Sequence, residues 1–110
     1  VPEHMLKLRG EIDRRFCQTI SLERLAKSFG RNKYALCRDF KKYFGIGFKE
    51  YVTTKRISYA KEILRFSDRS VSEISEMLGY ENTEYFIALF KRYEHTTPLA
   101  FRKKWQNLRA

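Results

Sequence analysis

The side chains of this chain that could do chemistry are mostly cationic. Its 110 residues hold 23 lysines and arginines against 13 aspartates and glutamates, which gives a formal net charge of +10 at pH 7. Ammonium and guanidinium groups bind phosphates, and a guanidinium also pairs with the edge of guanine. So large a charge on a chain of one-domain length predicts a polyanionic partner. Nucleic acid is the first candidate and an anionic membrane surface is the second.

The chain has few residues of the types that catalyse reactions. Cys17 and Cys37 do not form a Cys-x-x-Cys pair, and His4 and His95 are the only histidines. The acidic residues are interleaved with Lys and Arg, as on solvated helix faces, and no glycine-rich phosphate loop is present. We therefore expect two reduced thiols in a reducing cytosol, no metal site, no cofactor and no catalytic residue, so the chain is predicted not to be an enzyme. No apolar run approaches the roughly 18 residues of a membrane span, and we expect no membrane partner.

The elements that must position these charges are helices. Apolar residues recur with a 3.6-residue period along the whole chain, and strand signals are nearly absent. We predict an all-α fold of about seven helices in a single domain over residues 1–110. Its parts are a first helix at about 3–17, a helix-turn-helix motif at about 21–45, a linker helix at about 48–66, a second helix-turn-helix motif at about 70–95 and a terminal helix at about 98–106.

The two motifs form an internal repeat. Ser21-Leu22-x-x-Leu25-Ala26-x-x-Phe29-Gly30 matches Ser70-Val71-x-x-Ile74-Ser75-x-x-Leu78-Gly79, and Asn32-x-x-x-Leu36-x-x-x-Phe40-Lys41-Lys42-Tyr43 matches Asn82-x-x-x-Phe86-x-x-x-Phe90-Lys91-Arg92-Tyr93. Each copy predicts an N-capped short helix, a glycine-containing turn and a second helix whose buried side includes Leu36 and Phe40, or Phe86 and Phe90. In the first copy, either Tyr43 or Phe44 is expected to complete that side. Generic antiparallel helix pairs explain one such copy as well, but not two with the same spacing.

The linker helix adds a geometric reason to expect DNA. Its 19 residues, 48–66, would extend about 28 Å at ~1.5 Å per residue. This length is close to the ~34 Å that separates successive major grooves on one face of B-DNA. We therefore expect two recognition helices that reach adjacent grooves of one duplex.

A longer pattern combines both motifs and the linker. It consists of Ser21-Leu22-x-x-Leu25-Ala26, Gly30, Leu36-x-Arg38-x-Phe40-Lys41, Gly45, Tyr51-x-x-x-x-Arg56-Ile57-x-x-Ala60-x-x-x-Leu64, Ile74-Ser75-x-x-Leu78-Gly79-Tyr80, Tyr85-Phe86-x-x-x-Phe90-Lys91 and Thr97-Pro98-x-x-Phe101-Arg102. Over residues 12–103 the chain thereby resembles the C-terminal DNA-binding domain of the AraC/XylS family of bacterial transcription regulators. The resemblance implies sequence-specific binding of double-stranded DNA, a cytoplasmic location at the bacterial nucleoid, and a separate sensory, dimerisation or receiver domain in the full-length protein. RNA polymerase is a candidate partner.

The resemblance also implies which residues contact DNA. Outward residues of the second helix in each motif would reach bases, namely Lys33, Tyr34, Cys37, Arg38, Thr83 and Glu84. Phosphate contacts would come from Arg31, Asn32, Lys41, Lys42, Lys49, Asn82, Lys91 and Arg92. Arg38 is the foremost candidate, because a guanidinium pairs bidentately with guanine O6 and N7. A solvated arginine at position 38 and a partly packed ring at Tyr34 remain open alternatives.

The second motif departs from the family pattern. Ala88 stands where an arginine would match Arg38, Glu84 stands where a serine or glutamine is common, and His95 replaces the usual glycine. Residues 31–49 carry six basic side chains and one acidic one, whereas residues 80–95 carry two basic and three acidic ones. We therefore predict that the first motif reads bases, while the second mainly packs, contacts the backbone or faces a protein. His95 would either adopt a strained left-handed conformation or end its helix differently.

Two other classes of function compete with this reading. A protein-interaction module would dock on polymerase or a partner regulator, using the surface around Tyr80 and Tyr85, with only weak affinity for DNA. Some domains of this type are fused to alkyl-transfer enzymes, but that chemistry needs an activated cysteine cluster and Cys37 stands alone. A gel shift with random duplex would separate a DNA reader from the interaction module.

Overall fold

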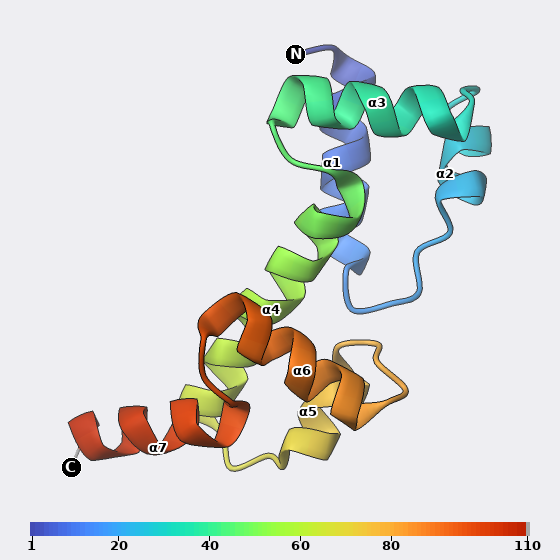
Figure 1. Ribbon diagram of the computed structural model, residues 1–110. Coiled ribbons are helices and arrows are strands. Elements are labelled where there is room, and N and C mark those ends of the chain that lie inside the picture. The colour runs from blue at the N-terminus through green and yellow to red at the C-terminus, as the bar shows by residue number, and fades with distance from the viewer. Residues whose placement is uncertain (110) are drawn as a thin grey trace. The chain divides into compact units, whose positions relative to one another are not determined.

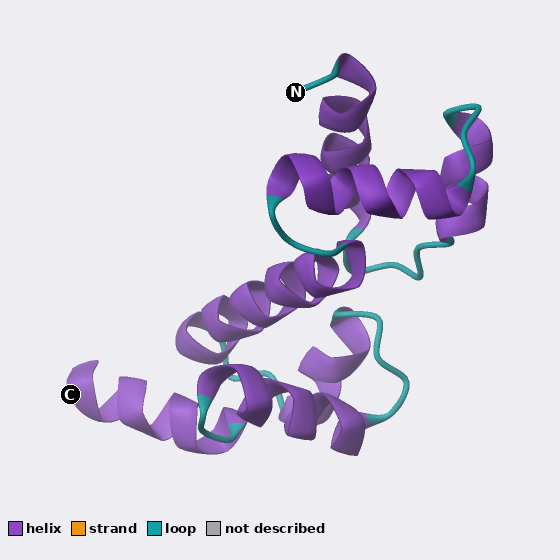
Figure 2. Cartoon of the chain, turned by 45° about the horizontal axis from the view of Figure 1, so that its top comes forward, coloured by secondary structure: helices purple, strands orange, loops and turns teal. Residues whose placement is uncertain are grey.

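The computed structural model describes residues 1–109, and within that range it contains helices and no strand (Figures 1 and 2). The helices are α1 (Glu3–Arg15), α2 (Leu22–Ser28), α3 (Lys33–Phe44), α4 (Phe48–Phe66), α5 (Val71–Met77), α6 (Thr83–Glu94) and α7 (Pro98–Arg109). The predicted all-α fold of about seven helices is confirmed. Two ends differ from the expectation: α1 stops at Arg15, where the chain turns, and α7 continues past residue 106 because no helix-breaking residue follows Trp105. Residue 110 of the predicted domain lies outside the described residues.

The chain divides into two compact units, residues 1–55 and residues 56–110. The first unit contains α1, α2, α3 and the start of α4, and the second contains the remainder of α4 with α5, α6 and α7. Each unit therefore holds one helix-turn-helix motif. No helix within residues 1–109 has the length and apolar composition that a membrane span requires.

The helices of both motifs begin at side chains that cap them. The Ser21 hydroxyl and the Asn32 carboxamide accept backbone N–H groups at the starts of α2 and α3. Ser70 and Glu73 form a complete capping box at the start of α5, with bonds of 3.1 and 3.2 Å, and Asn82 caps α6. These local hydrogen bonds satisfy N–H groups that have no partner within the helix. The caps predicted for the two short helices, at Ser21 and Ser70, are confirmed.

The two turns are built in the same way. Gly30 and Gly79 adopt positive φ angles of 64° and 89°. The N–H groups of the residues that follow them, Arg31 and Tyr80, donate back to carbonyls five positions earlier at 2.8 and 3.0 Å. This is the Schellman arrangement, in which a left-handed residue turns the chain sharply out of a helix. The repeated glycines therefore have a conformational reason.

The ends of α3 and α6 show one difference between the copies. Gly45 ends α3 with a φ angle of 73°, and His95 ends α6 with a φ angle of 63°. Both backbone N–H groups donate to the carbonyl four residues earlier at 2.8 Å. Of the two alternatives for His95, the left-handed conformation is correct, so α6 ends at a residue whose Cβ makes that conformation costly.

The first unit buries one side of α1 against α3. Its core contains Met5, Leu8, Ile12, Leu25, Ala26, Leu36, Phe40 and Val52, and α2 packs against α3 beside it. Phe44 lies half-buried against this cluster, with the Arg9 guanidinium 4.6 Å from its ring centre. Tyr43 is exposed, so Phe44 and not Tyr43 completes the buried side of α3.

The second unit repeats this core around α6. Its buried residues include Ile57, Ala60, Ile63, Leu64, Ile74, Leu78, Phe86, Leu89 and Phe90. Lys61 pairs with Glu94 at 3.1 Å, and the Arg102 guanidinium donates to the carbonyls of Leu64 and Ser67 at 3.1 and 3.2 Å. Arg102 therefore satisfies carbonyl groups at the end of α4 that the helix itself leaves unpaired.

Candidate nucleic-acid interface

Helix α3 presents a basic stripe to solvent. Its buried side is set by Leu36 and Phe40, which are fully buried. On the other side, position 38 lies four residues after position 34, and positions 41 and 42 lie three and four residues after position 38; all four side chains are exposed. They are Tyr34, Arg38, Lys41 and Lys42. A helix with this division can lay its exposed stripe in a groove while its apolar side stays in the core.

Arg38 lies near the middle of this stripe and is available to a ligand. The side chain is exposed, and among residues 1–109 it makes no hydrogen bond or ion pair. A solvated guanidinium keeps all its N–H donors for a carboxylate, phosphate or guanine edge. Its counterpart in α6 is Ala88, which is exposed and has no polar group.

Lys33, at the first position of α3, is not free. Its ammonium donates to the Glu23 carboxylate of α2 at 2.9 Å and lies 5.1 Å from the centre of the Tyr34 ring. The hydrogen bond raises the pKa of Lys33 and lowers the pKa of Glu23, and their mutual attraction acts in the same direction. Sequence reasoning missed Glu23, because only the turn between α2 and α3 brings two residues ten positions apart together.

Tyr34 and Cys37 complete the predicted base contacts of the first unit. The Tyr34 side chain is 70% exposed, so most of its ring is available to a ligand. Cys37 is half-buried and free of any disulfide. The thiol therefore offers little more than a small apolar contact at the margin of the stripe.

The residues of the first unit that are predicted to contact phosphates differ in the interactions that their side chains make within the chain. Asn32 uses its Oδ1 atom to cap α3, which leaves its Nδ2 group as the donor for a phosphate. Arg31 lies in the turn with one guanidinium nitrogen 3.4 Å from His4 Nδ1. Lys41, Lys42 and Lys49 are exposed and make no ion pair within residues 1–109.

Helix α6 of the second unit carries a different surface. Glu84 is exposed near its start, Thr83 is half-buried, and Asn82 uses its carboxamide to cap the helix. Lys91 and Arg92 are exposed near its end. The α6 helix therefore offers phosphate-binding groups only in its last turns.

The surface around Tyr80 and Tyr85 is largely occupied from within the second unit. The Tyr80 ring stacks on Phe86 with centres 5.7 Å apart, and the Arg56 guanidinium lies 4.8 Å from its centre. Tyr85 is 59% exposed and leans on Tyr80 at 5.9 Å. Tyr85 is thus the one member of this group with most of its ring in solvent.

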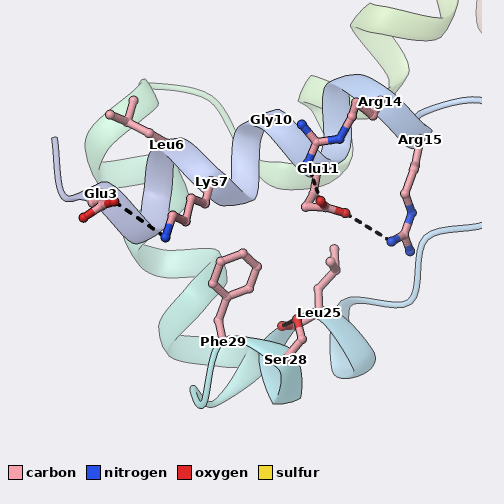
Figure 3. Close-up of a pocket in the computed structure, with 10 residues that line it drawn as sticks. All are labelled: Glu3, Leu6, Lys7, Gly10, Glu11, Arg14, Arg15, Leu25, Ser28 and Phe29. Carbon is pink, nitrogen blue, oxygen red and sulfur yellow. Dashed lines mark hydrogen bonds and ion pairs between the residues drawn. The ribbon is translucent and has the colours of Figure 1, made fainter.

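An open cleft lies between α1 and α2 of the first unit (Figure 3). Leu6, Leu25 and Phe29 form its apolar part, and charged residues surround them. Figure 3 shows that these charges are paired along α1, with Lys7 on Glu3, and Arg14 and Arg15 both on Glu11. None of the residues predicted to contact DNA lines this cleft. No cluster of metal-ligating side chains occurs among the residues that the structure describes.

Known proteins share both the sequence pattern and this fold. A family model described as "Helix-turn-helix domain" matches residues 25–104. The regulatory protein PocR of Salmonella typhimurium is 35% identical over 100 residues, which are 91% of this chain and 33% of PocR. The chain thus spans about a third of the length of this relative.

Two solved structures extend the likeness. The C-terminal domain of the two-component response regulator yesN from Fusobacterium nucleatum is 30% identical, with a TM-score of 0.86, and the match covers 92% of this chain and 99% of that domain. The DNA-binding domain of the global transcriptional factor AdpA, crystallised with a target DNA, has a TM-score of 0.90 at 20% identity, covering 98% of this chain and 97% of that one. The latter shows the fold alone. On the family match and these likenesses, the chain belongs to the AraC-type helix-turn-helix family of transcription regulators.

Proposed function

We propose that this chain binds double-stranded DNA in a sequence-specific manner, as the output domain of a bacterial transcription regulator. The observation that carries the proposal is the exposed stripe of α3, where Arg38, Lys41 and Lys42 make no ion pair within the described residues. Cations left unpaired on a helix that is anchored by a buried apolar side suit the phosphates and base edges of a major groove. AdpA, whose fold the chain shares, was crystallised with DNA.

The proposed contacts fall into two classes. Arg38 reads bases, with Lys33 and Tyr34 beside it at the start of α3 and Cys37 at the margin. Lys41, Lys42, Lys49, Arg31 and the Asn32 carboxamide position the domain on phosphates. In the second unit, Thr83 and Glu84 face bases weakly, whereas Asn82, Lys91 and Arg92 contact phosphates.

The remainder of the regulator is proposed from the relatives. PocR is about three times as long as the matched region, and the yesN structure is the C-terminal domain of a response regulator. We therefore place this chain beside a sensory or receiver domain in its full-length protein, with RNA polymerase as a candidate partner and the bacterial nucleoid as its location. The proposal includes no catalytic step, metal or cofactor.

A gel-shift titration tests the proposal. Random-sequence duplex should bind at low salt, and log K against log[salt] should fall with a slope near −4 to −5, as expected for about five neutralised phosphates. A duplex selected from a random pool should bind more tightly than the random duplex at every salt concentration. A flat salt dependence would contradict duplex binding and favour the protein-interaction module.

A further inference from the structure

One predicted DNA contact is held by an ion pair before any DNA arrives. Within residues 1–109, Lys33 pairs with Glu23 at 2.9 Å, whereas Arg38, Lys41, Lys42, Lys49, Lys91 and Arg92 make no ion pair. The pair joins the second residue of α2 to the first residue of α3, so it links the two helices of the helix-turn-helix motif near the start of each. Exposed ion pairs contribute little to stability, and the Glu23 side chain is 70% exposed. We therefore expect the ion pair to act in DNA binding and not in stability.

The ion pair lies at the start of α3, which is the part of a recognition helix that reads bases. The first residues of such a helix contact base edges in the major groove. The Lys33 ammonium has a second restraint there, because it lies 5.1 Å from the centre of the exposed Tyr34 ring. The Glu23 carboxylate and the Tyr34 ring together restrain the ammonium at the start of α3.

The carboxylate discriminates between the two kinds of acceptor that DNA offers. An ammonium has three N–H donors, so Lys33 can keep its bond to Glu23 and still donate to a neutral acceptor such as guanine O6 or N7. A phosphate is an anion, and it would have to approach the same ammonium beside the negative charge of Glu23. The pair therefore disfavours a phosphate far more than it disfavours a base.

We infer that Glu23 is a specificity-determining residue of the first helix-turn-helix motif, which acts through Lys33. By holding the ammonium, it withholds Lys33 from the phosphate backbone of arbitrary DNA and directs it to base edges. This inference rests on the proposed function. Glu23 is a positioning residue, because it acts through its ion pair with Lys33.

The test compares the wild-type chain with Glu23→Gln on two duplexes of about 25 bp, a length of roughly two and a half turns. One has random sequence, and the other is selected from a random pool with the wild-type chain. In Glu23→Gln, Lys33 becomes free for a phosphate, so affinity for the random duplex should rise about two- to fivefold. The salt slope on that duplex should steepen by about 0.9, one further phosphate. The ratio of selected to random affinity should fall.

Two controls isolate the ion pair from simple charge. Glu50→Gln makes the same change of net charge in the same unit, at an exposed residue whose side chain makes no ion pair within the described residues. It should change the two affinities by similar factors and leave their ratio constant. In a Lys33→Gln background, Glu23→Gln should no longer steepen the salt slope.

The outcomes separate the inference from the function on which it rests. If the wild-type chain binds neither duplex, the proposed function fails. If it binds both and Glu23→Gln leaves the affinity ratio and the slope unchanged, or matches Glu50→Gln in both, the inference is overturned. Partial unfolding of a variant cannot imitate the expected result, because it would lower both affinities together and leave their ratio unchanged.

Discussion

Within each unit, helices contact one another at equivalent places, but the kinds of side chain that make the contact differ between the units. Buried residues of α1 and of α4 share one spacing, with Met5, Leu8 and Ile12 in the first unit and Ile57, Ala60 and Leu64 in the second. The residue that directly follows the middle member of each set is a cation, Arg9 in the first unit and Lys61 in the second. Arg9 lies over the ring of Phe44 at 4.6 Å, whereas Lys61 forms an ion pair with Glu94 at 3.1 Å. A cation stands at this place in both units, but it contacts an aromatic ring in the first and a carboxylate in the second.

A second equivalent place differs in the same way. In the first unit Asp13 accepts a hydrogen bond from the Tyr51 hydroxyl at 2.6 Å and pairs with Lys55 at 3.4 Å. In the second unit the cation stands at the place of Asp13 and not at the place of Lys55. It is Arg65, whose guanidinium lies 4.9 Å from the centre of the Trp105 ring. Helix packing thus tolerates exchange of polar partners as long as the buried apolar positions are kept.

The two units also differ in charge, although the residues compared above carry the same net charge in each. Residues 1–55 carry thirteen basic and six acidic side chains, and residues 56–110 carry ten basic and seven acidic ones. Four of the ten basic residues in the second unit belong to α7, at positions 102–109, and not to its helix-turn-helix motif. One fold can therefore be used twice with unequal affinity for a polyanion, because its surface charge is independent of its core.

The largest expected effect concerns this difference in charge. Replacing Lys41 and Lys42 together by Gln should lower affinity for random duplex about tenfold or more and reduce the magnitude of the salt slope by about two, because two phosphate contacts are lost. Replacing Lys91 and Arg92 together by Gln should change both quantities less, because the three acidic residues among residues 80–95 already weaken the phosphate contacts of the second motif. Binding titrations over a range of salt measure the two double variants side by side. Equal losses would remove the proposed inequality between the units.

An intermediate effect concerns the contact between Tyr51 and Asp13. Partial burial, together with the hydrogen bond to Asp13, raises the pKa of Tyr51 to about 12. The folded chain therefore holds this proton longer than the unfolded chain does, so stability from this group is complete below pH 10 and is lost as pH rises towards 12.

Ultraviolet titration of tyrosinate measures that pKa. Asp13→Asn should lower it toward 10, and Tyr51→Phe should reduce the free energy of unfolding by about 1 kcal/mol, a modest amount because the bond is partly solvated. Phe101 occupies the matching position of the second unit and has no hydroxyl, so it provides no such titration. An unchanged tyrosine titration in Asp13→Asn would show that the hydrogen bond is not formed.

The smallest expected effect concerns the ends of α3 and α6. His95→Gly should raise the free energy of unfolding by less than about 1 kcal/mol, since relief of left-handed strain is partly offset by the greater freedom of glycine in the unfolded chain. Gly45→Ala should lower it by about 1–2 kcal/mol. A Cβ at Gly45 would meet no atom within 4 Å, so its cost lies in the backbone alone. Thermal unfolding measures both, and a stabilising Gly45→Ala would contradict the account.

Features encoded within a few residues could be predicted from the sequence. The caps of the short helices at Ser21 and Ser70 and the glycines of the two turns depend on neighbours in the chain, and they occur where expected. The apolar period also predicted the core, because a helix side that recurs every three or four residues has to be buried. The choice between Tyr43 and Phe44 was not decidable in this way, since both lie near the edge of the buried side.

Contacts between distant residues could not be predicted. The Glu23–Lys33 pair depends on the angle of the turn between α2 and α3, and Arg102 reaches two carbonyls at the end of α4 from 35 or more positions away. No periodicity or cap specifies which long side chain meets which polar group across two helices. For the candidate interface, the sequence predicted the exposed cations but not the one that is already paired.

The central claim is that the first motif reads bases and the second does not do so to the same degree. Footprinting and affinity measurements with Arg38→Ala and Glu84→Gln on the selected duplex, and on variants with single base pairs changed under each motif, test it most directly. We expect Arg38→Ala to cost about 1–3 kcal/mol of discrimination, roughly five- to 150-fold, at base pairs under the first motif, while Glu84→Gln leaves discrimination nearly unchanged. Equal losses of discrimination from the two substitutions would contradict the account.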